Sequence, residues 1–228
     1  MPDPLERAIK LLEQKKTKNA ENPPAAPQPP ASAHEMPLHD PELSARIDRL
    51  VAAAQDARRR KDGDAECRIW EHLTTLAPDH VELWLERGVA LRQNGRAEEA
   101  LKCYDRMLTL DPNHVIGWRS KGVAYANLDR LAEAKACYEK SLSLDPSNHE
   151  TWNSIAVLHV RSGDPHSAKP CYEKALELNP TSTWAMRNLM ICHLRLDDTD
   201  AAIATARRIL AIDPNYAEAL AFLQHLDD

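Results

Sequence analysis

The chain has 228 residues, a formal net charge of −6, 43% hydrophobic residues and only six glycines. This acidic balance argues against general nucleic-acid binding, and no run of 18 apolar residues predicts a membrane span. The first 16 residues hold no apolar block long enough for a secretory signal, so we expect a cytoplasmic protein.

The N-terminal residues 1–18 predict a short amphipathic helix. Leu5, Ala8, Ile9 and Leu12 follow the spacing i, i+3, i+4, i+7, and four lysines lie beside them. A helix this short is marginal in water, so we expect it to form only against another surface. Three interpretations stay open: a docking helix for a partner (Leu5, Ile9, Leu12), with a membrane-surface helix as a variant; a plug that binds the rest of the chain; or a frayed tail.

Residues 19–41 predict a disordered or polyproline-type linker. This segment holds seven prolines and few side chains that could be buried. At roughly 3.1 Å per residue, it would span about 70 Å. Two PxxP spacings lie within it without a flanking basic residue, so the spacer interpretation is favoured over a ligand for a proline-binding domain.

From residue 42 onward the chain repeats every 34 residues. Prolines, tryptophans, small residues, alanines and aromatics all recur in one register. The rows are Pro78, Pro112, Pro146, Pro180, Pro214; Trp84, Trp118, Trp152; Gly88, Gly122, Ala156; Ala100, Ala134, Ala168, Ala202; and Trp70, Tyr104, Tyr138, Tyr172. A fixed period of this size is typical of a solenoid, in which each copy packs on its neighbours.

Each copy predicts a pair of antiparallel helices. Apolar residues recur by threes and fours over residues 81–94 and again over residues 97–110. Gly95 favours the left-handed backbone that ends the first helix, and Pro112 marks the end of the second. We expect the small-residue row to let the two helices approach closely, and the aromatic row to fill the space between hairpins.

The spacing W-x3-G-x2-[LY] … A-x3-Y … P in residues 84–112 and 118–146 resembles the tetratricopeptide repeat. The resemblance covers about residues 47–216. It implies an all-α, right-handed superhelical solenoid of about five helix-turn-helix repeats over residues 42–228, with a C-terminal capping helix. The repeats are expected at 47–80, 81–114, 115–148, 149–182 and 183–216, and the cap, with a polar solvated end, at 217–226.

Several copies depart from this pattern. Glu66 replaces the alanine of the first copy, and in the fifth copy Met190 and Ala206 replace the glycine and the aromatic residue. Atypical terminal copies are expected in such arrays. Pro170 lies inside the second helix of the fourth copy, where a lost hydrogen bond costs about 3 kcal/mol. It predicts a kink or a later start of that helix, with a functional opening as the alternative.

Cysteines and histidines predict structural roles. Cys103, Cys137 and Cys171 share one repeat position, so neighbours would lie about 10 Å apart, beyond disulfide reach. We expect free, partly buried thiols. His159 and His193 share a position that is apolar or aromatic in earlier copies, which predicts core residues; a paired ligand or a pH sensor is the alternative.

No pattern in the chain predicts catalysis, and no metal or cofactor is expected. Neither zinc-ligand spacing, nor a nucleophile with its base, nor a glycine-rich phosphate loop is present in the sequence. The basic run at residues 58–61 ends the first helix of copy one, where cations interact favourably with the helix dipole. A nucleic-acid patch or localisation signal is its alternative.

In the tetratricopeptide family, the first helices of the hairpins line a concave groove that binds an extended peptide or a helix. By this resemblance, the groove has three stripes with an aliphatic centre flanked by arginine or asparagine: Arg119, Val123, Asn127; Asn153, Val157, Arg161; Arg187, Ile191, Arg195. Arginine binds carboxylates in bidentate fashion, and asparagine can bond a peptide backbone. We expect an acidic peptide with apolar anchors, unless these arginines are simply solvated.

These features predict a non-enzymatic protein-interaction scaffold or adaptor. Leu85, Glu86 and Val89 stand where chaperone-binding family members carry lysine and asparagine, which argues against recognition of a chaperone's acidic C-terminal tail. Two alternatives stay open: a co-chaperone or secretion-type chaperone that uses the same groove, and a regulatory subunit of an enzyme or motor that acts through the N-terminal helix. The partner and the oligomeric state stay open.

Overall fold

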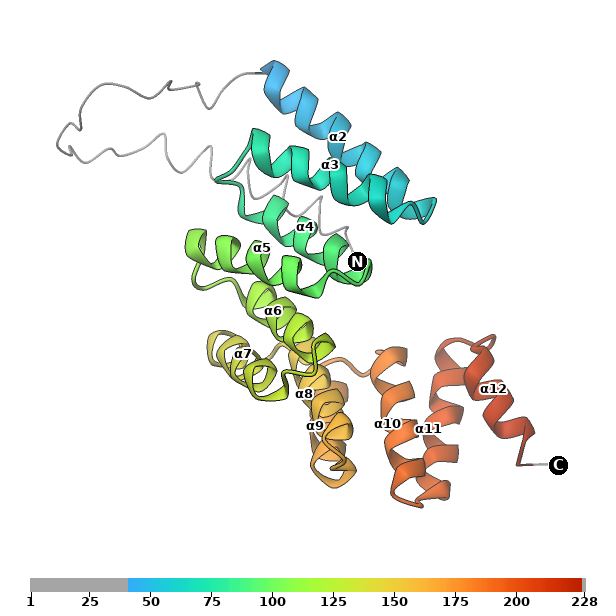
Figure 1. Cartoon of the computed structure of the whole chain (residues 1–228). Helices are drawn as coiled ribbons and strands as arrows, with labels where there is room; N and C mark the ends of the chain where they lie inside the picture. The colour runs from blue at the N-terminus through green and yellow to red at the C-terminus, as the bar shows by residue number, and fades with distance from the viewer. Residues whose placement is uncertain (1–40, 227–228) are drawn as a thin grey trace, which may run out of the picture. The chain divides into compact units, whose positions relative to one another are not determined.

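The computed structural model describes residues 41–226, which form eleven α-helices and no strand (Figure 1). The chain divides into two units, Met1–Ala52 and Ala53–Asp228. Helix α2 (Pro41–Arg59) begins in the first unit and ends in the second. The predicted amphipathic helix and all but the last residue of the predicted linker lie outside the described residues.

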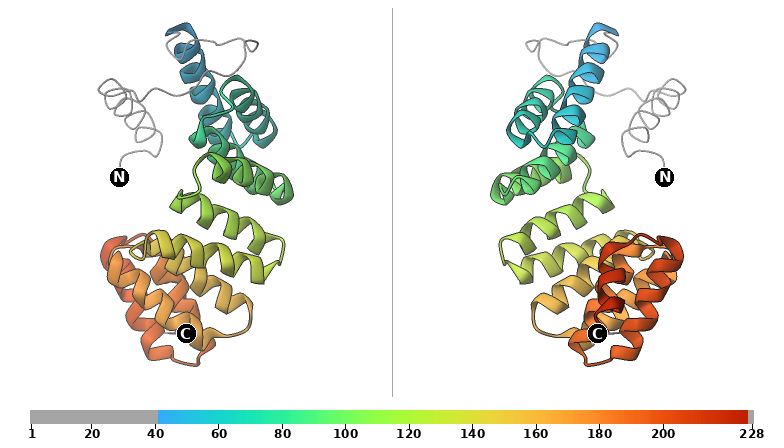
Figure 2. Two further views of the ribbon diagram at one scale, coloured as in Figure 1. Left: turned by 90° about the vertical axis from the view of Figure 1, so that its left-hand side faces the viewer. Right: turned by 90° about the vertical axis from the view of Figure 1, so that its right-hand side faces the viewer.

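The second unit consists of helical hairpins that follow one another along the chain (Figure 2). Helices α4–α5, α6–α7, α8–α9 and α10–α11 pair as hairpins, and each hairpin contacts the next one. The first helices of successive hairpins also touch each other, α4 with α6, α6 with α8 and α8 with α10. The helices are α3 (Gly63–Leu76), α4 (Val81–Gln93), α5 (Ala97–Leu110), α6 (Val115–Asn127), α7 (Leu131–Leu144), α8 (His149–Arg161), α9 (Pro165–Leu178), α10 (Thr183–Arg195), α11 (Thr199–Ile212) and α12 (Ala217–Gln224).

The 34-residue period governs the helix boundaries. First helices begin at residues 81, 115, 149, 183 and 217, and second helices at residues 63, 97, 131, 165 and 199. Each second helix ends at a residue with extended backbone just before a proline of the proline row, as at Asp111 (φ −133°) and Asp145 (φ −143°). The residue before proline is excluded from the helical region, which explains why every second helix stops at the same place.

The turn inside each hairpin has a left-handed residue at one fixed position. These residues are Lys61, Gly95, Asp129, Gly163 and Asp197, with φ between 58° and 80°. Glycine adopts this backbone readily, aspartate tolerates it, and lysine does so at a cost of about 1–2 kcal/mol. From the sequence, the left-handed residue was predicted only at Gly95, because glycine favours that backbone and lysine or aspartate does not predict it.

The tryptophan row and the proline row are joined by hydrogen bonds. The indole Nε1 of Trp84 donates to the carbonyl oxygen of Pro78 at 2.8 Å. Trp118 and Trp152 repeat this bond to Pro112 at 2.8 Å and to Pro146 at 2.9 Å. Each tryptophan therefore links its helix to the turn that precedes it. The tryptophan row and the proline row supply the two partners of this repeated hydrogen bond.

Small residues allow close approach in the α4–α5 and α6–α7 hairpins, as predicted, and the tyrosine that meets each glycine belongs to the same hairpin. A Cβ atom on Gly88 would lie 2.4 Å from Cε1 of Tyr104, and one on Gly122 would lie 2.5 Å from Cε1 of Tyr138. In the last hairpin the sizes are exchanged. Met190 and Ala206 are both buried in one core cluster, so the large side chain now comes from the first helix and the small one from the second.

The degenerate first copy is held by a charged network. Glu66 is only 3% exposed, and its carboxylate binds Nε of Arg58 at 2.6 Å. The same guanidinium binds Glu86 at 2.9 Å and so links the first copy to the second. Glutamate at an alanine position is thus explained by an arginine that satisfies its charge. The Arg58 pKa is raised, because these two carboxylates outweigh the lowering effect of burial.

One expectation about the C-terminal half needs correction. Helix α9 begins at Pro165 and runs through Pro170 without interruption, so a later start is wrong. Pro170 is exposed, and the helix tolerates it on its solvent side. At the C-terminal end, Gln224 and His225 are exposed, and Leu220, Leu226 and the nearby Ile212 are exposed beside them.

Candidate partner-binding surface

All nine predicted groove residues lie on the first helices α6, α8 and α10. Within each helix they are four residues apart, so each stripe follows one helix face. The helices that carry the stripes contact each other, and Asn188 Nδ2, next to Arg187 on α10, donates to Asn153 Oδ1 on α8 at 3.4 Å. We call the set of nine residues the first-helix surface. Its central row, Val123, Val157 and Ile191, is half-buried.

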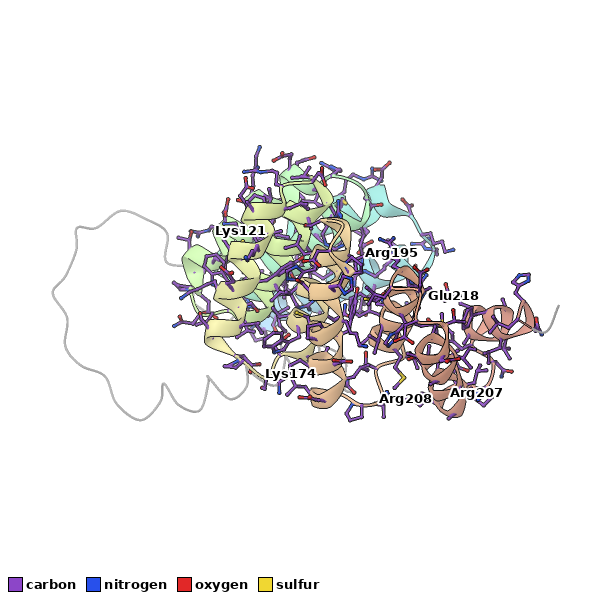
Figure 3. All side chains as sticks on the ribbon, turned by 90° about the horizontal axis from the view of Figure 1, so that it is seen from below. Lys121, Lys174, Arg195, Arg207, Arg208 and Glu218 are labelled. Carbon is purple, nitrogen blue, oxygen red and sulfur yellow. The ribbon has the colours of Figure 1, made fainter. Side chains whose placement is uncertain are left out.

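Two of the predicted arginines already bind carboxylates of the next copy. Arg119 on α6 pairs with Glu150 on α8 at 2.7 Å. Arg187 on α10 pairs in the same way with Glu218 on α12, which Figure 3 labels. Glu218 raises the pKa of Arg187, and Arg187 lowers the pKa of Glu218. This pairing joins the fifth position of one copy to the second position of the next, so the pattern within a single copy does not predict it.

The remaining polar residues differ in their availability. Asn153 is 1% exposed and its Nδ2 has no protein partner in the described part of the chain, while Asn127 is exposed. Arg161 binds Asp129 at 3.3 Å. Arg195 is exposed and forms no ion pair with the residues described (Figure 3). Arg195 is therefore the predicted cation that is free to meet a ligand's carboxylate.

Three exposed apolar residues on these helices were not predicted, among them Leu194 on α10, which is 37% exposed. Trp184 is 51% exposed on α10 and Ile116 is 39% exposed on α6. Trp184 and Ile116 occupy the second position of their copies, which is acidic in the others (Asp48, Glu82, Glu150 and Glu218). From residue 82 onward, position two thus alternates between glutamate and an apolar residue. Aligning the second position of every copy would have revealed this signal.

The cysteines and His193 are structural. All five cysteines are free thiols, four buried and Cys171 partly buried. Burial raises the pKa of Cys103 and of Cys137 to about 11, so these thiols stay protonated. His193 is 5% exposed, as a core position requires. Burial lowers its pKa, followed by the charge of Lys169, although Asp198 lies 3.5 Å away and opposes this.

The three arginines of the basic run at residues 58–61 bind carboxylates of their own copy and of the next one. Arg58 holds Glu66 and Glu86, as described above, while Arg59 and Arg60 both bind Asp56 at 3.4 and 2.8 Å. Within residues 41–226, no three acidic, histidine or cysteine side chains gather as metal ligands would. No helix in the same range is long and apolar enough to cross a membrane.

Comparisons with known proteins agree with this architecture. Three family models described as tetratricopeptide repeat match residues 51–115, 89–150 and 159–226. No curated protein matches the chain.

Solved structures resemble the fold at low sequence identity. TTC0263, a thermophilic TPR protein of Thermus thermophilus, has a TM-score of 0.69 at 16% identity and covers 77% of this chain and 95% of its own. MamA from Desulfovibrio magneticus RS-1 has a TM-score of 0.59 at 18% identity, with coverages of 75% and 97%. YrrB, titled a TPR protein with an unusual peptide-binding site, has a TM-score of 0.54 at 12% identity, with coverages of 80% and 97%. The 34-residue hairpins and the three family matches place this chain in the tetratricopeptide repeat superfamily.

Proposed function

We propose that this chain is a non-enzymatic cytoplasmic scaffold or adaptor that binds a peptide or helix of a partner protein on its first-helix surface. The observation that carries the proposal is the combination of Trp184 and Arg195 on α10, one an exposed aromatic ring and the other an exposed, unpaired cation among the described residues. Exposed aromatic residues and arginines are the side chains that dominate protein interfaces. A related fold titled as peptide-binding supports the same assignment.

The ligand expected for this surface has apolar anchors and acidic groups. Trp184, Ile116 and the half-buried central row supply apolar contacts. Glu150 and Glu218 already form ion pairs with Arg119 and Arg187. An acidic ligand would therefore either bind Arg195 or displace these internal carboxylates. We therefore give the apolar anchors the larger share of affinity, and the carboxylates the smaller one.

Affinity capture with the full chain tests this function. Partners retained by the wild type should be lost from Trp184→Ala and weakened by Arg195→Glu, because both changes remove contacts on α10. The matched control is Trp118→Phe, which keeps an aromatic ring at a site bonded to Pro112. Partners that are retained equally by all variants would refute the use of this surface.

Deleting residues 1–40 separates the scaffold from a regulatory subunit that acts through its N-terminal segment. A scaffold or a chaperone keeps its partners without this segment, whereas a regulatory subunit loses them.

A further inference from the structure

Ion pairs join neighbouring copies at the first two junctions, at one repeated position. Arg87 on α4 binds Glu71 on α3 at 2.8 Å. One period later, Lys121 on α6 binds Asp105 on α5 at 2.6 Å. Asp105 raises the Lys121 pKa and outweighs the lowering effect of burial. A cation at the seventh position of a first helix thus reaches the acid of the preceding second helix.

These cations also rest on aromatic rings. The Arg87 guanidinium lies 5.7 Å from the centre of the Trp84 ring. Lys121 Nζ lies 5.4 Å from the centre of the Trp118 ring and 5.8 Å from that of Tyr125. A ring face attracts a cation within about 6 Å. The site therefore holds the whole side chain, with its stem against apolar surface and its charge at the carboxylate.

At the next two junctions the cation is missing but the acid remains. Ile155 and Leu189 occupy the seventh position on α8 and α10, while Glu139 and Glu173 continue the acidic row at intervals of 34 residues. Glu139 has only a loose partner, Lys135 on its own helix, at 3.9 Å. Glu173 forms no ion pair with any described residue.

A hollow opens at each of these two junctions. The hollow at the α7–α8 junction measures about 300 Å³ and includes Glu139, Ile155 and His159 in its lining. The hollow between α9, α10 and α11 measures about 410 Å³ and includes Glu173 and Leu189. A histidine lines each hollow, His159 in the first and His193 in the second, at the position of Leu91 and Tyr125 in earlier copies. Neither lining contains a residue of the first-helix surface.

We propose that these two hollows bind lysine or arginine side chains of a basic segment of a partner protein. The chain's own Arg87 and Lys121 show which side chain fits such a junction, and Glu139 and Glu173 supply the unmet charge. The hollows lie one copy apart, and the first helices of these copies, α8 and α10, contact each other. Because packed helices lie about 8–10 Å apart, two cations separated by roughly 10 Å would engage both hollows at once. Lys135 and Arg208 border the hollows and oppose a second cation, so the incoming charge must sit close to the glutamates. This interface is separate from the one assigned under the proposed function.

A synthetic peptide tests the proposal on the full chain. The probe is a fluorescein-labelled, alanine-based helix with two lysines seven residues apart, which places them about 10 Å apart at 1.5 Å per residue. The control peptide carries glutamine in place of both lysines. Fluorescence anisotropy should show binding of the lysine peptide and at least five-fold weaker binding of the glutamine peptide. Equal binding of the two peptides would overturn the proposal.

Protein variants localise the binding to the hollows. Glu139→Gln combined with Glu173→Gln should weaken the lysine peptide at least five-fold. Glu98→Gln combined with Asp200→Asn changes the net charge equally at exposed sites outside the hollow linings and should leave binding within two-fold. Equal loss in both double variants would show a general charge effect and refute the assigned site.

Supplying the missing cation internally gives an independent test. Ile155→Lys restores the side-chain type that Arg87 and Lys121 provide, and Ile155 is half-buried, so the variant should fold. The new lysine should form an ion pair with Glu139 and so reduce binding of the lysine peptide. Ile155→Leu adds no cation and should leave peptide binding unchanged. Unchanged binding in Ile155→Lys, with its helical circular dichroism intact, would also overturn the proposal.

Discussion

The last hairpin, α10–α11, has its large residue on the first helix and its small residue on the second, and this arrangement can be introduced into the α4–α5 hairpin by mutation. Tyr104→Ala deletes a fully buried ring, which costs about 3–5 kcal/mol for aromatic residues. Gly88→Met places atoms where Cε1 of Tyr104 lies only 2.4 Å from the new Cβ. Such overpacking costs about 1–3 kcal/mol or more. If the two effects were independent, the double variant would lose about 4–8 kcal/mol.

The double variant Gly88→Met/Tyr104→Ala should instead be more stable than this sum. It reproduces the exchanged sizes of Met190 and Ala206, which are buried in one core cluster, and we expect the methionine to fill the space that the deleted ring leaves. We expect a favourable coupling of about 1–3 kcal/mol, measured by urea denaturation followed by circular dichroism. The cycle needs wild type, both single variants and the double variant in the full chain. A double variant that loses the full sum of the single losses would refute the idea that these positions share one volume.

Further predictions concern stability and reactivity. Glu66→Gln should destabilise the chain by about 1–3 kcal/mol, because it replaces the buried carboxylate that binds Nε of Arg58 by a neutral amide and leaves Glu86 as the charged partner of Arg58, and denaturation will measure this loss. Since the His193 pKa is lowered in the fold, the unfolded chain binds its proton more readily. Stability should therefore fall as the pH drops below about 6.5, and His193→Gln should flatten that decline. Lys61→Gly should stabilise the left-handed turn by about 0.5–1 kcal/mol, whereas Lys61→Ala should not. Thiol reagents at pH 8 should modify Cys103 far more slowly in the native chain than in urea; equal rates would contradict its burial.

The hairpins and their order could be predicted because the same residues recur at the same helix positions in each copy. Pro112 and its equivalents in the proline row each end a second helix. Gly88 and Tyr104 together indicate that the two helices of their hairpin approach closely. These signals act within one copy, so a single sequence repeats the evidence several times.

Contacts between copies could not be predicted with the same ease. Arg119 looks like a free groove cation until Glu150 of the next copy is placed beside it. Likewise, Glu66 looks like a defect until Arg58 is seen to bind it. Whether a charge is satisfied depends on the distance between two copies, which the spacing of residues alone does not give. The predicted stripes therefore located the surface but overstated its free positive charge.

The indole bonds to the proline carbonyls have a consequence for how the array comes apart. Trp84, Trp118 and Trp152 each tie a hairpin to the preceding turn, but the fifth copy has Met186 at this position, and a thioether has no N–H to donate. In a linear array, opening spreads from the junction with the fewest links. Amide hydrogen exchange should therefore be fastest in α10, α11 and α12 among the helices from α4 onward, and the chain should unzip from its C-terminal hairpin.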